Sequence, residues 1–532
     1  MIAGSADAVV VGAGHNGLVA ANLLADAGWE VLVLEATDTP GGSVRSADLA
    51  APGFLGDLCS AFYPLGVSSP VLRALDLERY GLRWCHAPHV LVHPLPDGRA
   101  AVLDRDPVVT ARSLEGFAPG DGGRWLAAYG RWRQVAPGVL SALFTPFPPV
   151  RAAAGLLRSL GPAAALRAVR QVALPARVAA EERFAGEGAR ALLAGCALHV
   201  DLTLEEVGGG AYGWLLAMLG QRYGFPVPAG GAQRLTGALV SRLRERGGRV
   251  LTGVRVDKVV VAGGRAVGVR CAGGDVWRAR RAVLADVPAT VLYRDLVGLA
   301  RLPARLVDDL SRFRWDHPTV RVDWALSGPV PWLHPAAAGA GTVHLGGDVN
   351  GLGRHAAALA RGEVPAGPFV ILGQLTTADR SRSPAGTESL WGYTRLPRRS
   401  GWAPETIAGQ VARVEAVLDS YAPGFCALVV GRRVAGPVAQ QAENPSLVGG
   451  ALGGGTAGAH QQLFLRPVPG LGRADTTVDR LYLASASAHP GAGVHGGPGA
   501  NAARAALARD RAVRGRLYAA GVGAAHRAIY RT

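Results

Sequence analysis

Two short apolar runs near the start of the chain enclose a stretch with helical periodicity. Residues 8–11 (Ala-Val-Val-Val) and 31–34 (Val-Leu-Val-Leu) are typical of buried strands, whereas residues 18–24 repeat leucine and alanine along one face of a helix. Gly28 is a natural C-terminal cap for that helix. The pattern therefore predicts a β–α–β unit that occupies the first 35 residues.

Farther along the chain, the hydrophobic pattern predicts a mixture of strands and helices. Residues 82–104 hold short apolar segments interrupted by prolines and an Asp-Gly pair, as in a hairpin, and residues 249–269 predict two strands joined by Gly263-Gly264. The other expected elements are helices at 204–219 and 404–419 and strands at 320–326 and 369–375. This mixture indicates an α/β protein, and a mixed sheet between about 300 and 470 is expected to build a substrate cavity.

The link between the first strand and its helix contains three spaced glycines. Gly12 permits the sharp turn, Gly14 lets the backbone approach a pyrophosphate, and Gly17 allows close packing at the helix start. Glu35 ends the second apolar run, where a carboxylate can accept hydrogen bonds from ribose hydroxyls. The chain holds 74 glycines, so an ordinary glycine-rich turn is the alternative. The flanking strand and helix favour a dinucleotide site.

Two further glycine-rich segments have the character of cofactor loops. Residues 36–45 (ATDTPGGSVR) form a loop that can pass close to a ligand while Arg45 presents a cation, although Arg45 also fits a solvated loop position. Residues 481–496 form a strand that enters a glycine-rich turn, and a helix follows from about residue 501. The amides and the positive end of that helix are suited to stabilise negative charge.

Together these motifs resemble the phytoene desaturase branch of the flavin amine oxidase superfamily, whose members bind FAD. Residues 52–54 (Pro-Gly-Phe) and 60–65 (Ser-Ala-Phe-Tyr-Pro-Leu) also resemble its phytoene dehydrogenase-like members. The resemblance implies a Rossmann-like FAD-binding domain interleaved with a mixed α+β substrate domain. It assigns FAD contacts to Gly12, Gly14, His15, Asn16, Gly17, Glu35, Ala36, Gly42, Ser43, Arg45, Val256, Ser487, His489, Pro490, Gly491, Gly493 and Val494.

The catalytic assignment is less determined than the cofactor assignment. His489 is the candidate for assisting proton transfer and His495 is a second histidine nearby, and structural roles stay open for both. The Gly-Asp pair that many related flavoproteins carry is absent, and Ser485 and Ser487 stand there instead. No histidine, cysteine or carboxylate spacing matches a metal site, so we expect none.

The resemblance divides the chain into interleaved parts. The expected FAD domain comprises residues 1–98, 225–300 and 470–515, the substrate domain comprises 99–224 and 301–469, and 516–532 is a C-terminal tail. We expect an oxidoreductase that desaturates or isomerises a hydrophobic polyene or other isoprenoid by hydride transfer to or from flavin. The alternatives are an amine oxidase-like enzyme and a flavin-binding interaction protein with little turnover.

Charge and cysteine content add limited information about partners and compartment. The net charge of +16 comes almost entirely from arginine, because Lys258 is the chain's one lysine, and this bias is typical of a GC-rich genome. We therefore expect no nucleic-acid partner. Five scattered cysteines and the lack of a leader or a long apolar run favour a reducing cytoplasm. The oligomeric state stays open.

One segment departs locally from the average charge distribution. Residues 122–180 contain eight arginines and no aspartate or glutamate, and residues 152–157 and 163–166 predict helical pieces separated by Gly161-Pro162. A basic amphipathic helix of this kind can lie on an anionic bilayer. The alternative is a pair of ordinary core helices whose outer faces are rich in arginine. A peripheral membrane contact is accordingly a hypothesis at this point.

Overall fold

The computed structural model describes residues 1–399 and 401–530, and its core contains two seven-stranded sheets. In the first sheet, β1, β2, β9, β12 and β18 are parallel neighbours, and β11 and β10 extend it in the antiparallel sense. Its order is β10 (Val256–Ala262), β11 (Arg265–Cys271), β12 (Val276–Ala285), β1 (Ile2–Val11), β2 (Val31–Leu34) and β9 (Arg249–Leu251), with β18 (Leu481–Leu483) also paired to β12.

Both faces of the parallel strands are covered, which explains their continuous apolar sequence. Val10 and Val33 pack with the helices α1 (His15–Asp26), α10 (Gln233–Glu245) and α18 (Gly497–Asp510), whereas Val9 and Leu32 face the opposite cluster. The predicted β–α–β unit is confirmed, including the helix end just before Gly28, whose φ is +79°. The predicted hairpin at Gly263-Gly264 is also present.

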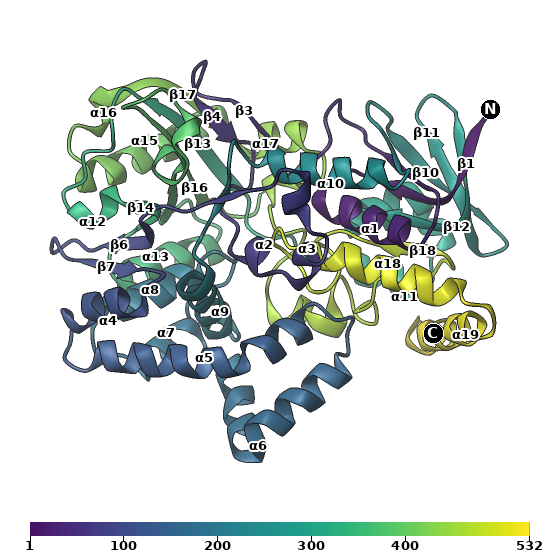
Figure 1. Cartoon of the computed structure of the whole chain (residues 1–532), viewed down its shortest axis with the longest axis horizontal. Helices are drawn as coiled ribbons and strands as arrows, with labels where there is room; N and C mark the ends of the chain where they lie inside the picture. The colour runs from purple at the N-terminus through teal and green to yellow at the C-terminus, as the bar shows by residue number, and fades with distance from the viewer. Residues whose placement is uncertain (400, 531–532) are drawn as a thin grey trace.

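The second sheet is mixed and lies beside the first, toward the left of Figure 1. Its order is β17 (Val429–Ala435), β13 (Thr319–Leu326), β16 (Glu388–Arg395), β15 (Val370–Gln374), β14 (Ala340–Leu345), β6 (His89–Pro94) and β7 (Ala100–Leu103). The strands predicted at 320–326 and 369–375 and the hairpin within 82–104 are confirmed. Because β6 starts at His89, this sheet takes a strand from within the segment 1–98.

Helices cover the second sheet and fill the space below it. α15 (Pro404–Tyr421) packs on β13 and confirms the helix expected at 404–419, and α8 (Glu187–Ala197) packs on β6 and β7. The helix expected at 204–219 begins later, as α9 (Gly209–Tyr223), because Gly208 takes a left-handed conformation (φ +91°) that ends the preceding turn. The neighbouring helices are α4 (Pro107–Glu115), α5 (Asp121–Leu143), α6 (Val150–Ala173) and α7 (Ala176–Glu181).

The remaining elements are short connections and the C-terminal helix. They are β3 (Ser46–Asp48), β4 (Leu55–Asp57), β5 (Trp84–Cys85), β8 (Val227–Pro228), α2 (Pro64–Ser68), α3 (Pro70–Arg73), α11 (Ala304–Ser311), α12 (Pro335–Ala338), α13 (Val349–Ala360), α14 (Leu375–Ala378), α16 (Phe425–Leu428), α17 (Pro437–Glu443) and α19 (Ala512–Tyr530). None of the helices in the described ranges is long and apolar enough to cross a membrane.

Helix α6 is the most exposed of the long helices around the body. It projects at the lower edge of Figure 1, and Ala165 is its one buried residue. The chain bends at Gly161, where φ is +71°, and Pro162 follows directly. The two predicted helical pieces separated by this pair are therefore confirmed as the two halves of α6.

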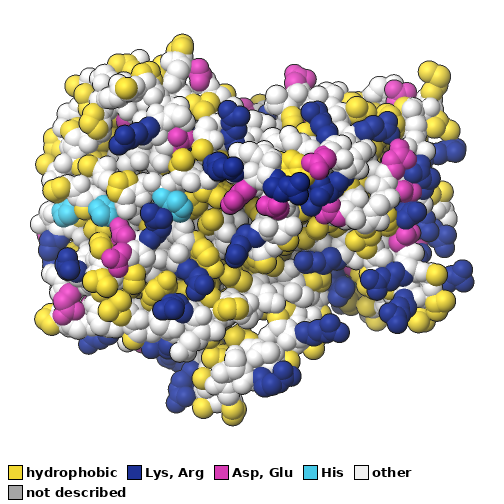
Figure 2. Space-filling view, viewed as in Figure 1, with side chains coloured by type: hydrophobic (Ala, Val, Ile, Leu, Met, Phe, Trp, Pro, Cys, Tyr) yellow, Lys and Arg dark blue, Asp and Glu magenta, His cyan; other side chains and the backbone are white. Residues whose placement is uncertain are grey.

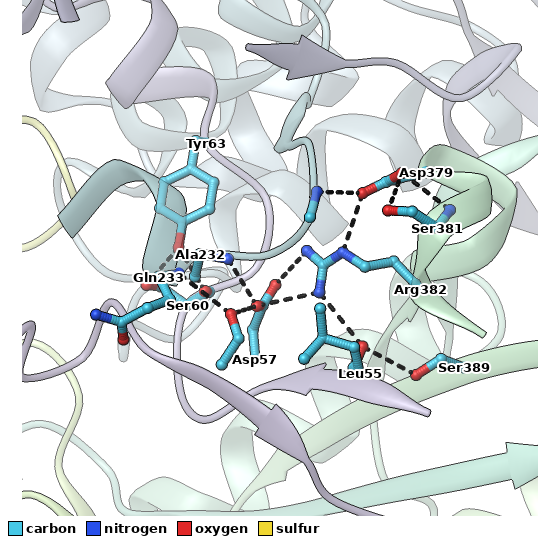
Figure 3. A network of polar contacts seen from close by, with 12 residues as sticks. Leu55, Asp57, Ser60, Tyr63, Ala232, Gln233, Asp379, Ser381, Arg382 and Ser389 are labelled. Carbon is cyan, nitrogen blue, oxygen red and sulfur yellow. Dashed lines mark hydrogen bonds and ion pairs between the residues drawn. The ribbon is translucent and has the colours of Figure 1, made fainter. Parts of the chain in front are cut away.

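A buried ion pair connects segments of the chain that lie far apart in sequence. The Arg382 guanidinium donates to both carboxylate oxygens of Asp57, at 3.2 and 2.9 Å, and both side chains are fully buried (Figure 3). Asp57 also accepts from the Ala232 amide at 2.9 Å, and Asp379 accepts from the Gly230 amide at 2.7 Å. The cluster thus joins β4, the glycine loop before α10 and the segment after β15.

This pair yields a prediction about stability. Replacing Arg382 with alanine leaves Asp57 buried without its cation, so we expect the free energy of unfolding in urea to fall by about 3–5 kcal/mol. Arg361→Ala is the matched control, because Arg361 pairs with Glu363 in solvent, where both side chains are more than half exposed. Equal, small effects of the two substitutions would contradict a structural role for the buried pair.

Candidate functional site

The glycine loop between β1 and α1 is shaped by a carboxylate from a neighbouring strand. Gly17 donates its amide to Oδ2 of Asp286 at 2.8 Å, and a Cβ added to Gly14 would lie 2.5 Å from the same oxygen. A Cβ on Gly17 would lie 2.3 Å from the Gly12 carbonyl oxygen, and Gly12 itself has a φ of +94°. Close packing inside the protein therefore requires glycine at all three positions.

Asp286 is a site residue that the motif did not identify. It directly follows β12, at the carboxyl end of the strand next to β1, and it lines the same cavity as the glycine loop. Burial raises the pKa of this carboxyl to about 7, and the negative charge of Glu35 adds to the rise. An uncharged Asp286 at or below neutral pH reduces the repulsion that an anionic phosphate would meet at this loop. The sequence signal for this site residue is the acidic side chain that directly follows the apolar run 282–285.

Glu35 is held in place by three hydrogen bonds at the end of β2. Its Oε2 accepts from the Ala13 amide at 2.8 Å, and its Oε1 accepts from the amide and hydroxyl of Thr37 at 2.9 and 2.8 Å. A carboxylate has about four acceptor positions, so one stays free for a ligand hydroxyl. Glu35 and Ala36 both line the cavity, as the ribose prediction requires.

The second glycine loop closes over the first. Gly41 donates its amide to the Ala13 carbonyl at 2.9 Å, and Gly42 adopts a φ of +56°. The Arg45 guanidinium donates to the Gly42 carbonyl at 3.0 Å and to the Glu443 carbonyl, so this cation is tied to the protein rather than solvated. Asn444 donates to the Ser43 hydroxyl at 3.0 Å. Sequence reasoning did not foresee the segment 443–447 as part of the site.

The C-terminal glycine loop meets the N-terminal loop directly. The His15 Nε2 donates to the Gly493 carbonyl at 3.2 Å, and a Cβ on Gly499 would lie 2.0 Å from the Asn16 carbonyl oxygen. Burial lowers the pKa of His15 to about 4, so the ring is neutral near pH 7. Residues almost 480 positions apart are thereby joined into one binding surface.

The two candidate histidines differ in their contacts. His489 does not appear among the residues that line the cavity, its ring packs edge-on against Phe147 with centroids 5.9 Å apart, and burial lowers its pKa to about 4. His495 lines the cavity, but Nε2 donates to the Ala492 carbonyl and Nδ1 accepts from the Gly497 amide. Neither ring has a geometry that favours proton exchange with a substrate, and the assignment of His489 stays a prediction.

One cavity of about 730 Å³ collects most of the predicted cofactor contacts. The predicted residues that line it are Gly12, Gly14, His15, Asn16, Glu35, Ala36, Gly42, Ser43, Arg45, Val256, Ser487, Pro490, Gly493 and Val494. Gly17 and Gly491 lie behind this surface, as His489 does. Ser487 is already engaged, since it donates to the Gly454 carbonyl at 2.8 Å and accepts from the Ala289 amide at 3.1 Å.

The cavity fits FAD at the end that the glycine loops form. Gly12 and Gly14 line the cavity without a side chain, and Glu35 retains an acceptor position for a hydroxyl. The Asn16 Oδ1 is buried without a hydrogen-bond donor among the described residues, and Asn16 lines the cavity. A ribose or ribityl hydroxyl would supply that donor. These residues would therefore hold the nucleotide and the polar chain of the cofactor.

The same cavity continues between the two sheets into an inner chamber. Phe62, Leu215, Phe225 and Ile371 line this part with apolar side chains, and polar residues lie among them. The inner polar residues are His199, Asp201, Tyr212, Asp316, Thr342, Trp391, Tyr393, Arg395 and Arg466. They come from six separate stretches of the chain, and sequence spacing carried no signal for bringing them together.

Comparison with curated proteins and solved structures places this architecture among flavin-dependent oxidoreductases. The chain is 27% identical to the rat protein "Pyridine nucleotide-disulfide oxidoreductase domain-containing protein 2", over 93% of this chain and 92% of the relative. It is 28% identical to hydroxyneurosporene desaturase of Cereibacter sphaeroides, over 91% and 94% of the two chains. Both relatives are matched over nearly their full length.

Solved structures show the same fold at lower identity. An oxidoreductase from Methanosarcina mazei aligns with a TM-score of 0.59 at 16% identity, over 94% of this chain and 99% of that chain. Putrescine oxidase bound to putrescine aligns with a TM-score of 0.54 at 14% identity, over 97% and 99%. At these identities the likeness concerns the fold and not the substrate.

The loop geometry yields a prediction about cofactor binding. Gly17→Ala places a Cβ against the Gly12 carbonyl, so the loop must move, and we expect FAD affinity to fall at least ~10-fold, or about 1.4 kcal/mol. Gly237→Ala on α10 is the control, because its Cβ would meet no atom within 4 Å. Fluorescence titration of released and rebound FAD measures both. Unchanged affinity in a folded Gly17→Ala protein would contradict the proposed packing.

The sequence profile of one family covers part of the chain that builds this site. The match spans residues 17–322, which is more than half of the chain and includes Glu35, Arg45 and Asp286. That family is described as flavin containing amine oxidoreductase, and curated phytoene and hydroxyneurosporene desaturases are among the relatives of this chain. The chain therefore belongs to the flavin containing amine oxidoreductase family, is similar to its phytoene desaturases, and has FAD as its cofactor.

Proposed function

We propose that this flavin oxidoreductase desaturates or isomerises a hydrophobic polyene or other isoprenoid. The observation that carries the proposal is the continuity of the cavity, which runs from the glycine loops into a chamber with extensive apolar walls. FAD supplies the hydride chemistry at a substrate carbon when it is bound. The protein has to bind the substrate, orient it and exclude water.

The chamber walls are suited to a flat, extended apolar molecule. Trp391 and Tyr393 stack with parallel rings, 5.6 Å between centroids and 2° between planes, and Phe62 lies 6.4 Å from Trp391. These rings present broad apolar surfaces along one side of the chamber, and leucines from α9 line it as well. Burial of apolar substrate surface against such walls provides the binding energy.

The chamber holds few groups that are free for acid–base work. Burial lowers the pKa of His199 to about 3 and raises the pKa of the Tyr212 and Tyr393 hydroxyls, so all three side chains are neutral near pH 7. Lys258, the one lysine of the chain, is not among the residues lining the cavity. An apolar substrate that reacts with the cofactor needs orientation more than it needs a base, in agreement with the proposal.

Anaerobic substrate titration tests this function. We expect flavin absorption near ~450 nm to bleach when FAD-loaded protein is mixed with carotenoids or shorter isoprenoids, because hydride transfer reduces the flavin. Putrescine and other amines form the second arm of the panel. Bleaching by amines alone would assign an amine oxidase-like activity. Because isomerisation leaves the flavin oxidised overall, the polyenes are also analysed for changed double-bond geometry, and neither bleaching nor isomerisation would favour a flavin-binding interaction protein.

We further propose that the projecting helix α6 contacts an anionic membrane surface. Leu157, Leu166, Val169 and Val172 are each more than half exposed along this helix, and arginines stand among them (Figure 2). The stretch 122–180 contains no carboxylate. Arg170 pairs with Glu182 at 2.6 Å, and the exposed apolar side chains beside the other arginines of this helix match the chemistry of a bilayer with acidic headgroups.

The position of α6 supports this arrangement for an apolar substrate. Helix α6 packs against α5 and α9, and Leu143 of α5 and Leu215 and Leu216 of α9 line the inner chamber. A helix on the membrane surface would therefore lie next to the wall of the chamber that receives a lipid-soluble substrate. The proposal places the protein at the cytoplasmic membrane surface.

Vesicle sedimentation tests the membrane contact. At low salt we expect the protein to sediment with vesicles that contain phosphatidylglycerol, and we expect Leu166→Glu/Val169→Glu to reduce the bound fraction about fivefold, because it removes apolar contact and adds negative charge. Val438→Glu is the control, since Val438 is equally exposed on α17. A wild-type protein that stays in the supernatant would refute the contact.

A further inference from the structure

Two buried arginines line the inner chamber without a carboxylate partner. Arg395 and Arg466 are 8% and 2% exposed, and among the described residues neither lies within 4.0 Å of an aspartate or glutamate oxygen. A buried cation without a counter-ion is costly, so such a group is retained where another partner satisfies it. The partners of these two residues differ.

Arg466 is satisfied by the backbone. Its Nε and Nη2 donate to the Ala486 carbonyl at 3.1 and 2.7 Å. Its Nη1 donates to the Thr456 carbonyl at 3.0 Å, and its Nη2 also donates to the Gly453 carbonyl at 2.8 Å. Each nitrogen of this guanidinium therefore has an acceptor. Arg466 fixes the loops around residues 453–456 and 485–487, which form part of the cavity wall.

Arg395 is only partly satisfied. Its Nη2 donates to the His199 carbonyl at 2.6 Å and its Nη1 donates to the His317 carbonyl at a longer 3.3 Å. Its Nε is buried and has no acceptor among the described residues. Both acceptors are neutral carbonyls, so no carboxylate of the described residues hydrogen-bonds this guanidinium, although its charge offsets the burial of Asp201 and lowers the pKa of that carboxyl.

Two further donors in the same chamber also lack acceptors. The Trp391 Nε1 and the Thr342 Oγ1 are buried without hydrogen-bond partners among the described residues, and both residues line the cavity. Trp391 and Arg395 lie on the same face of β16, because side chains alternate along a strand. Thr342 of β14 pairs with Gly373 of β15, and Gly373 pairs with Trp391 of β16. Thr342 and Trp391 therefore lie in one row across these three strands.

The carboxylates nearby do not supply the missing acceptor. Asp201 accepts from Arg398 at 2.6 Å and from the Ala457 amide at 2.7 Å. Asp316 accepts from the amides of residues 452, 453 and 455. With both carboxylates ionised, three arginines (395, 398 and 466) face two acids, so this region carries at least one net positive charge.

We propose that Arg395 binds a carboxylate on the substrate, so that the substrate is an apolar chain or ring system with an acidic end group. The inference rests on the proposed function of this cavity and specifies its substrate class. A carboxylate accepts hydrogen bonds, carries the opposite charge and matches the Arg395 Nε, which lacks an acceptor, whereas an ammonium group would add a second charge of the same sign. The apolar remainder lies along Phe62, Leu215 and Ile371.

Three ligands with one tail and different end groups test the proposal. Farnesoic acid, methyl farnesoate and farnesylamine are titrated into FAD-loaded protein, and binding is followed by the change in the flavin spectrum. We expect the acid to bind at least ~10-fold more tightly than the ester, because a charge-assisted hydrogen bond to arginine is lost in the ester. L-Phenylalanine serves as a fourth ligand, which separates an amino-acid carboxylate from an isoprenoid carboxylate.

Variants distinguish binding from folding. Arg395→Gln is expected to reduce affinity for the acid at least ~10-fold and leave affinity for the ester unchanged, and Arg395→Lys is expected to recover part of the loss because it keeps the charge. Arg399→Gln is the matched control, since it removes an exposed arginine four residues away that donates to the Gly362 carbonyl and does not line the cavity. FAD occupancy and melting temperature are measured for each variant, and Arg395→Lys serves where Arg395→Gln fails to fold.

The outcomes separate this inference from the proposed function. Equal binding of acid and ester, preference for the amine, or no binding of any ligand overturns the carboxylate site even if apolar polyenes bleach the flavin. Preferential binding of farnesoic acid supports the site even if no isoprenoid is oxidised. Preferential binding of L-phenylalanine overturns the inference, because this ligand brings an ammonium group into a region that already carries net positive charge.

Discussion

The buried pair of Arg382 and Asp57 fixes how three segments that lie far apart in sequence meet beside the cavity. Asp57 stands two residues before Cys59, which lines the cavity, and Arg382 follows β15 of the second sheet. Replacing both members of a buried ion pair with apolar residues often leaves the folding free energy unchanged or more favourable. The main effect of such a pair is therefore not its net contribution to stability. The geometry of the pair matters more, because Asp57 also accepts a hydrogen bond from the Ala232 amide and thereby aligns three segments around one cavity.

The dinucleotide end of that cavity was predictable because its determinants are local in sequence. Gly12, Gly14 and Gly17 with Glu35 occur in one short stretch, and the strand and helix periodicities around them agree with it. The role of Asp286 was not predictable in the same way. Its effect on the loop depends on β12 pairing in parallel with β1, a contact between residues more than 270 positions apart.

The inner chamber shows why the rest of the site was not accessible from sequence. Trp391 and Arg395 look like ordinary strand residues, and Thr342 lies on a strand whose neighbours become known only from the sheet order. Their shared feature is a buried donor that lacks an acceptor among the described residues, which no residue pattern encodes. The helix expected at 204–219 started too early for a related reason, since the left-handed turn at Gly208 is a backbone conformation and not a periodicity.

A charged contact at one end of an apolar chamber has a consequence for selectivity. Apolar walls bind a polyene strongly but allow it to slide, because dispersion and burial change little when the chain shifts by one unit. A polar end group held by Arg395 removes that freedom, since a shift would break a charge-assisted hydrogen bond in a region of low dielectric. The distance from the bound end to the reacting carbon is then fixed, so the chamber wall itself selects which carbon–carbon bond meets the flavin.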